Sequence, residues 1–506
     1  MSKTFAKPSS NGKNLRNHKS FPVNVKVISR NVGYALLVSA LFMFFSVLVS
    51  LWNGHDSALA ALLISFVITF TVGIFPFIFV RKTAAISLKD GYMIIFLAWT
   101  LSFIFGMLPY LLWGGPFTVV NAWFESVSGY TTTGGTILED IEQLPKSLLF
   151  WRSSTHFIGG LGIVVFLLLI IPSSSPVKLR LTNMELSSLS REGYRSRANK
   201  TVIIFTTVYL GLGAAAAICY WVAGMSPFDA VNHAMSVCAT GGFSTRNLSI
   251  GHFHSDLINW ITIVFMILAS IHFAIIYMVL ATRSLKPLRN PVLRYYIGSI
   301  LVITFFVAGS LKLFSVQESW SRALMDGLFH VVSYASTTGF AISDNAGWPL
   351  FPCILLLVVG IQCGMAGSTT GGLKSDRVIV LFKSLKRQVR LAIHPSSVSE
   401  IRVGNHILHD EDAYPHILYI AVFFLFLLVS ILLCLSISGN NQDAITGSIS
   451  MLTNVGPSMG RIGTFGNYAS QPVAIKLIFT FDMFLGRIEI YPILAVISML
   501  FTRSRK

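Results

Sequence analysis

The stretch NAWFESVSGYTTTGGT, residues 121–136, decides the fold, because three further stretches of the chain align with it without a gap. They read DAVNHAMSVCATGGFS from residue 229, DGLFHVVSYASTTGFA from residue 326 and DAITGSISMLTNVGPS from residue 443. Each begins with Asn or Asp, then has serine seven residues later and glycine thirteen residues later: Ser128, Ser236, Ser333 and Ser450, then Gly134, Gly242, Gly339 and Gly456. Matches at fixed positions in four copies indicate an internal repeat.

Long apolar runs surround these stretches. Runs close to the bilayer-spanning length of about 20 residues lie at 32–52, 58–80, 201–222, 258–280 and 417–437. The chain is 53% hydrophobic and 12% charged, whereas a soluble domain carries about 25% charged residues. A buried core helix explains any one run, but their number favours an integral membrane protein.

The repeating unit is therefore a helix, a short re-entrant segment and a second helix. Four units supply eight spans, and the hairpin at 32–80 raises the total to ten. We predict an all-α integral membrane protein of ten transmembrane helices, in which four helix–pore-loop–helix units surround a central pore. The expected divisions are a basic arm (1–31), the N-terminal hairpin (32–90) and units one (91–200), two (201–293), three (294–414) and four (415–506).

Most of the basic residues lie in six segments. Thirty of the 38 Lys and Arg residues lie at 1–31, 81–89, 178–200, 283–294, 374–402 and 503–506. These basic segments alternate with loops that are acidic or neutral. The pattern follows the positive-inside rule and predicts that both termini are cytosolic. The net charge of +17 therefore indicates topology and not a nucleic-acid partner. The polar first 31 residues do not resemble a signal peptide, and the five cysteines suit buried thiols better than disulfides or a metal site.

The residue types of the repeat suit an ion pathway. Asn or Asp is a good N-cap for a short helix, and the C-terminal end of such a helix favours a cation. Small polar residues and a glycine follow, and glycine allows successive carbonyls to face one axis. Non-helical backbone at membrane depth must pack in protein or line a wet cavity. Four turns that only pack helices together are the alternative interpretation.

The chain resembles the Trk/Ktr/HKT superfamily of potassium transporters, specifically the bacterial TrkH-type membrane subunit. The resemblance rests on TTTGG at 131–135, ATGGFST at 239–245, STTGF at 336–340 and NVGP at 454–457, and it covers nearly everything after residue 32. It implies a potassium filter with selectivity at the four glycines. The carbonyls implied to line it belong to Thr132, Thr133, Gly134, Thr240, Gly241, Gly242, Thr337, Thr338, Gly339, Asn454, Val455 and Gly456. The fourth repeat lacks threonine before its glycine, which implies looser discrimination against sodium or rubidium.

The second helix of the third unit is interrupted by a glycine-rich stretch. Four glycines in nine residues hold a membrane helix poorly, and the family resemblance implies an intramembrane gate loop there. Its members are Gly364, Gly367, Ser368, Thr369, Thr370, Gly371 and Gly372. A small-residue packing surface is the alternative.

Arg487 lies in an expected last span at 479–501. The resemblance implies that it faces the pore below the filter, and an ion pair with Asp482 or Glu489 is the alternative. Glu125, His233 and His330 occupy the fourth position after the expected cap, where they tune the outer mouth or, as we favour, bond within the short helices. The Asp residues at the repeat starts are expected to be caps, and the glycines at 159–162 to serve packing.

Potassium uptake across the inner membrane, passive or ion-coupled as a symport, is the leading functional hypothesis. The resemblance implies a homodimer and a TrkA-like cytosolic ring that binds NAD or ATP. This chain has no dinucleotide fingerprint of its own, so we expect no cofactor beyond potassium as substrate. The basic segments 178–200 and 374–402 are docking candidates, or topology signals only. Two alternatives remain: a sodium-transporting or sodium-coupled relative, and an intramembrane hydrolase that uses Ser368 with His272 or His156. Glycine at all four filter positions favours potassium, because serine at the first is linked with sodium in plant members.

Overall fold

The computed structural model of the chain describes residues 24–80, 87–162, 198–397, 400–404 and 406–503. The first half contains α1 (Val25–Trp52), α2 (Leu59–Phe79), α3 (Leu88–Gly106), α4 (Leu108–Trp113), α5 (Val119–Tyr130), α6 (Lys146–Leu161), α10 (Ala198–Val222), α11 (Pro227–Cys238), η1 (Ser249–Phe253), α12 (Asp256–Ser270) and α13 (Phe273–Thr282). The second half contains η2 (Lys286–Arg289), α14 (Pro291–Leu313), α15 (Trp320–Ala335), α16 (Leu350–Gln362), α17 (Ser375–Ile393), β1 (Ile401–Val403), β2 (His406–Leu408), α18 (Asp410–Ile437), α19 (Asn441–Thr453), η3 (Gly460–Ile462), α20 (Val473–Ile488) and α21 (Ile490–Arg503).

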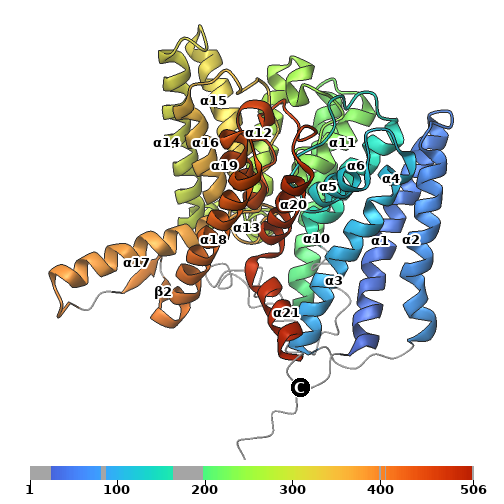
Figure 1. Cartoon of the computed structure of the whole chain (residues 1–506). Helices are drawn as coiled ribbons and strands as arrows, with labels where there is room; N and C mark the ends of the chain where they lie inside the picture. Colours follow the sequence, from blue (N-terminus) through green and yellow to red (C-terminus); the bar gives the residue numbers. More distant parts are fainter. Residues whose placement is uncertain (1–23, 81–86, 163–197, 398–399, 405, 504–506) are drawn as a thin grey trace, which may run out of the picture.

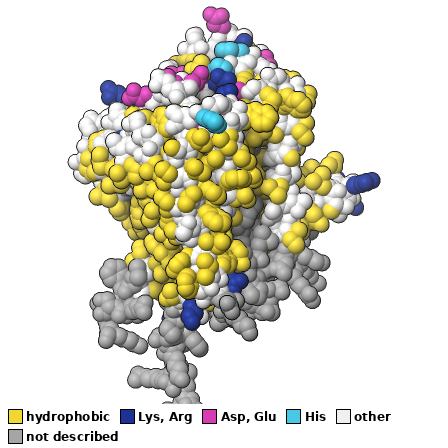
Figure 2. Space-filling view, turned by 90° about the vertical axis from the view of Figure 1, so that its right-hand side faces the viewer, with side chains coloured by type: hydrophobic (Ala, Val, Ile, Leu, Met, Phe, Trp, Pro, Cys, Tyr) yellow, Lys and Arg dark blue, Asp and Glu magenta, His cyan; other side chains and the backbone are white. Residues whose placement is uncertain are grey.

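Several helices can cross a bilayer. Six in the described part of the chain are long and apolar enough, and seven if the bent pair α12 and α13 counts as one span. Figure 2 shows a broad hydrophobic band on one face, with charged and histidine side chains gathered above it and Lys and Arg below it. A membrane-spanning helical bundle is thus the observed fold class, whereas the total of ten spans stays a prediction.

The expected N-terminal hairpin is formed by α1 and α2, which pack closely. A Cβ on Gly33 of α1 would lie 2.7 Å from the carbonyl oxygen of Gly73 in α2, so only glycine allows this approach. The first helix begins at Val25, earlier than the expected residue 32, because the Asn24 side chain caps it and the Asn24 N–H donates to Asp90 Oδ1 at 2.8 Å. Of the predicted arm, residues 1–23 lie outside the described residues.

After the hairpin, a long helix, a short helix and a second helix follow one another four times along the chain. The short helices α5, α11, α15 and α19 lie in the upper half of the molecule in Figure 1. Their start positions correct one expectation. The Asn and Asp residues do not cap them, since the side-chain caps are Thr118, Ser226, Ser319 and Asn440. The first three helices begin earlier because Thr or Ser accepts a hydrogen bond from the N–H three residues on, and the fourth because Asn440 accepts from Gln442 N–H at 3.0 Å.

The run 258–280, expected to be one span, is in fact two helices. Helix α12 ends at Ser270, and α13 leaves it at 102°. The freed backbone groups are paired: Phe273 N–H donates to Gly367 O at 3.1 Å, and Ser270 O accepts from Met365 N–H at 3.0 Å. Because these partners lie almost a hundred residues away, nothing in the local sequence marks the break.

The final expected span, 479–501, is also broken. Helix α20 ends at Ile488, Glu489 has a φ of 69°, and α21 begins at Ile490. The break in the third unit was predicted: α16 ends at Gln362, and Cys363 follows with a φ of 48°. In the first unit, α6 ends at Leu161, before Gly162 with a φ of 74°. Each of the four second helices is thus no longer than 16 residues before it ends or breaks.

Helix α17 leaves the bundle sideways in Figure 1 and is followed by the two short strands. They pair antiparallel with Arg402 opposite Ile407. Among the described residues, these two are the only strands, and the other elements are helices. Ile401 and Val403 pack in a small hydrophobic cluster with Val380 of α17. The five cysteines are free thiols, four of them buried and Cys219 partly exposed, which agrees with the sequence interpretation.

Candidate functional site

Below each short helix the chain makes the same bend. A residue with left-handed φ is followed two positions later by a glycine with positive φ, a conformation that suits glycine best. The four pairs are Thr132 (52°) with Gly134 (82°), Thr240 (54°) with Gly242 (83°), Thr337 (54°) with Gly339 (75°), and Asn454 (58°) with Gly456 (91°). The fourth unit thus reaches the same conformation with asparagine, a residue that tolerates the left-handed region.

The four bends meet at one place. A Cβ built on each glycine would lie against a carbonyl oxygen of the next unit: Gly134 against Gly241 O at 2.1 Å, Gly242 against Thr338 O at 2.1 Å, Gly339 against Val455 O at 2.3 Å, and Gly456 against Thr133 O at 2.2 Å. The contacts run from unit one to two, three, four and back to one. The bends therefore form a closed ring of main chain, which we call the glycine ring.

The glycine ring borders a cavity. All four glycines line it, together with charged residues that include Glu139, Arg152 and Arg246. On the neighbouring loop, a hydrogen bond from Asn247 lowers the pKa of the partly exposed Asp140 carboxyl. That carboxylate remains charged over the ordinary pH range, on the side of the molecule where acidic residues favour cations.

The repeated serines connect the short helices to the ring. Ser128, Ser333 and Ser450 donate to the carbonyl seven residues later, at 2.6, 2.6 and 2.8 Å. In the second unit Ser236 differs, because its hydroxyl contacts His156 Nδ1 at 3.1 Å. In three of the four units the serine side chain thus bonds the carbonyl that follows the ring glycine.

Several threonine hydroxyls of the bends are used within the protein. Thr131 and Thr133 share a hydrogen bond at 2.8 Å, and Ser336 and Thr338 share one at 2.7 Å. Asn454 Nδ2 donates to Thr133 Oγ1 at 2.9 Å and so connects the fourth unit to the first. These bonds stabilise the bends without using the main-chain oxygens of the ring.

The glycine-rich loop that follows α16 packs under the ring. Thr240 Oγ1 donates to Thr369 O at 3.0 Å, and Gly371 N–H donates to Thr337 Oγ1 at 3.1 Å. A Cβ on Gly371 would lie 2.7 Å from Thr453 O, so the loop also closely approaches the fourth unit. The structure thus brings the predicted gate residues against the predicted filter residues.

Arg487 joins three parts of the molecule at this level. Its guanidinium donates to Thr369 O in the loop and to Gly159 O and Gly160 O, the last two at 2.8 and 3.1 Å. Of the partners considered from the sequence, Glu489 pairs with Arg377 at 2.8 Å, and Asp482 accepts from Ser430. The helix end at 159–160 is tightly packed as expected, because a Cβ on Gly159 would lie 1.8 Å from Tyr130 O.

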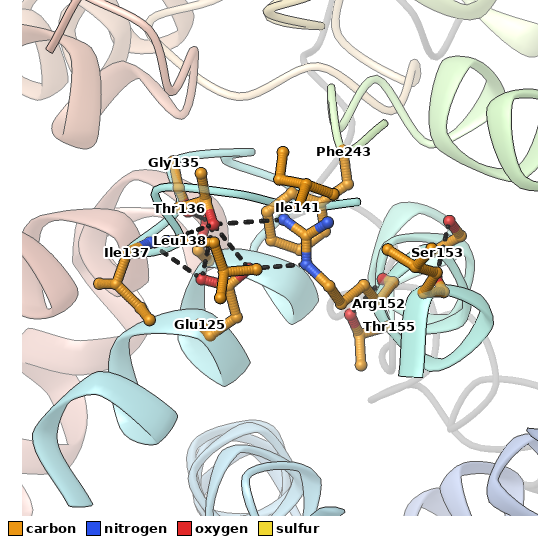
Figure 3. Close-up of polar contacts among 12 residues, drawn as sticks. Glu125, Gly135, Thr136, Ile137, Leu138, Ile141, Arg152, Ser153, Thr155 and Phe243 are labelled. Atoms are coloured by element: carbon orange, nitrogen blue, oxygen red, sulfur yellow. Dashed lines mark hydrogen bonds and ion pairs between the residues drawn. The ribbon is translucent and has the colours of Figure 1, made fainter. Parts of the chain in front are cut away.

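The residues four positions after the repeat start hold the segment beyond the ring. His233 Nε2 contacts Ser244 Oγ at 2.9 Å and His330 Nε2 contacts Ser343 O at 3.2 Å, while each Nδ1 contacts a carbonyl of its own helix. For these histidines, the Nδ1 contact is the expected bond within the short helix, and the Nε2 contact to the segment beyond the ring was not expected. Glu125 instead pairs with Arg152 (Figure 3), a residue that sequence reasoning missed, although a lone arginine after a polar loop was a visible signal.

The hydrolase alternative finds no support in the contacts of its residues. Ser368 Oγ bonds Met365 O and Thr370 Oγ1. His156 contacts Ser236, and His272 Nδ1 accepts from Ala274 N–H at the start of α13. The described residues also contain no group of His, Cys, Asp and Glu that would hold a metal ion.

Comparison with known proteins gives concordant matches. The family model of TrkH, cation transport protein, matches residues 59–503. The Trk system potassium uptake protein TrkH of Escherichia coli (strain K12) is 32% identical over 486 residues, 95% of this chain and 100% of that protein. The protein of that name from Salmonella typhimurium is 33% identical over 427 residues, 84% of this chain and 88% of that protein.

A solved structure agrees with them. The crystal structure of the potassium transporter TrkH from Vibrio parahaemolyticus matches with a TM-score of 0.84 and 30% identity, over 93% of this chain and 98% of that one. The family model extends over the spans from α2 onward, the glycine ring and the loop beneath it. The chain belongs to the TrkH family of cation transport proteins.

Proposed function

We propose that this protein takes up potassium across the inner membrane through the glycine ring. The single observation that supports this most is the cyclic contact of four glycines with four carbonyls, because a ring of main-chain oxygens can replace the hydration shell of a potassium ion. The relatives named as potassium uptake proteins agree with that substrate. The family is one of transport proteins, so the chain is not an enzyme.

The atoms proposed to bind the ion are the carbonyl oxygens at the four bends. They belong to Thr132, Thr133, Gly134, Thr240, Gly241, Gly242, Thr337, Thr338, Gly339, Asn454, Val455 and Gly456. The contacts that hold several of the Thr, Ser and Asn side chains within the protein support this assignment, because they do not use the main-chain oxygens of the bends. The Gly456 oxygen also accepts a hydrogen bond from Tyr468 Oη at 2.7 Å.

The loop under the ring is the proposed gate. It would open by moving away from Thr240 and Thr337, which it contacts in this structure. Arg487 would oppose cations at the same level through its positive charge, and its bond to Thr369 O would hold the loop closed. The gate thus comprises Gly364, Gly367, Ser368, Thr369, Thr370, Gly371, Gly372 and Arg487.

A homodimer in the bilayer and control by a cytosolic nucleotide-binding ring are proposed as well, with both termini cytosolic. The name "Trk system" that the relatives carry supports a multi-component assembly. One docking candidate, 178–200, falls almost wholly outside the described residues. The other, 374–402, contains α17 with its exposed Lys383, Lys386 and Arg390. These cations would suit an acidic partner surface.

Rubidium uptake into liposomes that contain the purified protein tests the proposal, with potassium or sodium as competitor. We expect potassium to compete at lower concentration than sodium, and Gly242→Ser to reduce that preference, since its side chain would push against Thr338 O. Stronger competition by sodium would identify a sodium transporter instead. An unchanged preference in a folded Gly242→Ser variant would remove this glycine from the filter.

A further inference from the structure

A buried ion pair lies beside the glycine ring in the first unit. Arg152 of α6 and Glu125 of α5 are 1% and 0% exposed, and Arg152 Nε lies 2.7 Å from Glu125 Oε1. A buried pair stabilises a fold only when further hydrogen bonds satisfy its remaining groups. The further hydrogen bonds of Glu125 and Arg152 show which segments of the chain the pair holds in place.

Glu125 binds the chain just beyond the ring in its own unit. Its carboxylate accepts from Thr136 Oγ1 at 3.0 Å and from Ile137 N–H at 3.1 Å (Figure 3). Thr136 is two residues after Gly134 of the ring. The carboxylate therefore fixes the segment that leaves the bend of the first unit.

Arg152 reaches into the second unit. Its Nη1 donates to Ser244 O at 3.3 Å. Its Nη2 donates to Thr136 Oγ1 at 3.3 Å, and its guanidinium carbon lies 4.0 Å from the centre of the Phe243 ring (Figure 3). Phe243 directly follows Gly242. The planar guanidinium thus contacts the exit segments of two neighbouring bends at once, a geometry that lysine does not reproduce.

The equivalent positions of the other units differ in charge. His233 and His330 hold a segment of their own unit. In the fourth unit the position is Gly447, where the Phe479 ring would lie 2.6 Å from a Cβ. The carboxylate with its arginine is thus a feature of the first unit, at the junction where Gly134 meets Gly241 O.

We propose that Arg152 and Glu125 are positioning residues for cation selectivity, which set the spacing between the bends of units one and two. This inference rests on the proposed filter function of the glycine ring. Ion discrimination depends on how many carbonyls reach the ion and how firmly they are held. Loss of the pair lets the two bends move apart and admits the competing cation.

The test measures rubidium uptake into liposomes and compares the concentrations of potassium and sodium that halve it. Arg152→Lys keeps the positive charge but lacks the planar guanidinium and its several N–H donors. The double variant Glu125→Gln with Arg152→Gln removes both charges, so that neither charge remains buried without its partner. We expect each to lower the preference for potassium by roughly tenfold, which corresponds to about 1.4 kcal/mol. Arg289→Gln, at an exposed arginine of η2, is the control and should keep the wild-type preference.

Gly242→Ser is measured in parallel so that the two proposals fail separately. If Gly242→Ser loses preference and the folded Arg152 variants keep it, the pair is merely structural and the inference is wrong. If Gly242→Ser also keeps it, the filter assignment itself fails. Should the Arg152 variants not fold, Phe243→Leu decides, because it removes the ring that packs against the guanidinium and against His156. A reduced preference supports the inference, and a wild-type preference overturns it.

Discussion

At the scale of single residues, the serine seven positions into each repeat contributes unequally in the four units. Three of these hydroxyls hold a carbonyl beyond their own bend, whereas Ser236 contacts His156. A chemically identical position thus has two structural roles. Variants of these serines can therefore distinguish the effect of losing a hydroxyl group from the effect of losing a hydrogen bond to the bend.

We expect Ser333→Ala to reduce the preference for potassium over sodium more than Ser236→Ala does. The first variant loses the 2.6 Å bond to Phe340 O, which contributes about 1 kcal/mol, and frees the third bend. Rubidium uptake with the two competitors measures the preference, and thermal unfolding of both proteins controls for general destabilisation. Equal losses of selectivity in the two variants would contradict this role for the hydroxyl.

At the scale of elements, the interrupted second helices determine where polar backbone lies in the membrane. The break after α16 was predicted from four glycines in nine residues, because glycine weakens a helix wherever it stands. The break between α12 and α13 was not, because it contains Ser270, Ile271 and His272, none of them a strong helix breaker. Its backbone bonds the gate loop of another unit, and such tertiary partners leave no local pattern.

The bends, too, were predictable from the local sequence only in part, because their contacts depend on tertiary packing. Positive φ at the repeated glycines follows from their residue type, so four turns at these positions were predictable. That Gly134 meets Gly241 O, and Gly456 meets Thr133 O, depends on how the units pack. Similarly, the side-chain caps were missed because Thr118 and Ser226 compete with the nearby Asn121 and Asp229 for the same role.

The gate loop gives a prediction at this scale. A methyl group on Gly371 would lie 2.7 Å from Thr453 O and Asn454 Oδ1, so Gly371→Ala should displace the loop from its place under the ring. We expect faster rubidium uptake by the chain alone, without a regulatory partner. Gly309→Ala is the matched control, since no atom lies within 4 Å of its added carbon. If both variants transport at the wild-type rate, the loop does not limit flow in this conformation.

At the scale of the whole molecule, the distribution of charge predicts the orientation in the membrane. Glu318, in the loop before α15, is exposed on the side of the short helices, and Gln388 is exposed on α17. Helix α17 itself carries Lys383, Lys386, Arg387 and Arg390, so the positive-inside rule places it in the cytosol.

We expect Glu318→Cys to react with a membrane-impermeant maleimide added to intact cells, and Gln388→Cys to react only after the membrane is permeabilised. Four native cysteines are buried, and Cys219, which is partly exposed, is replaced by serine to remove background labelling. The reverse pattern of labelling would invert the topology and place the gate loop on the external side.

The contact of each ring glycine with its neighbour has a consequence for how the four units behave together. Since every bend occupies the space that the adjoining glycine leaves empty, a side chain inserted in one unit displaces the main chain of another. Effects of substitutions in contact are not additive. Once one insertion has displaced the neighbouring bend, a second glycine replacement has less order left to disrupt and should do less further harm than the first. Although the four repeats differ in sequence, ion specificity should therefore be a property of the whole ring and not of single units.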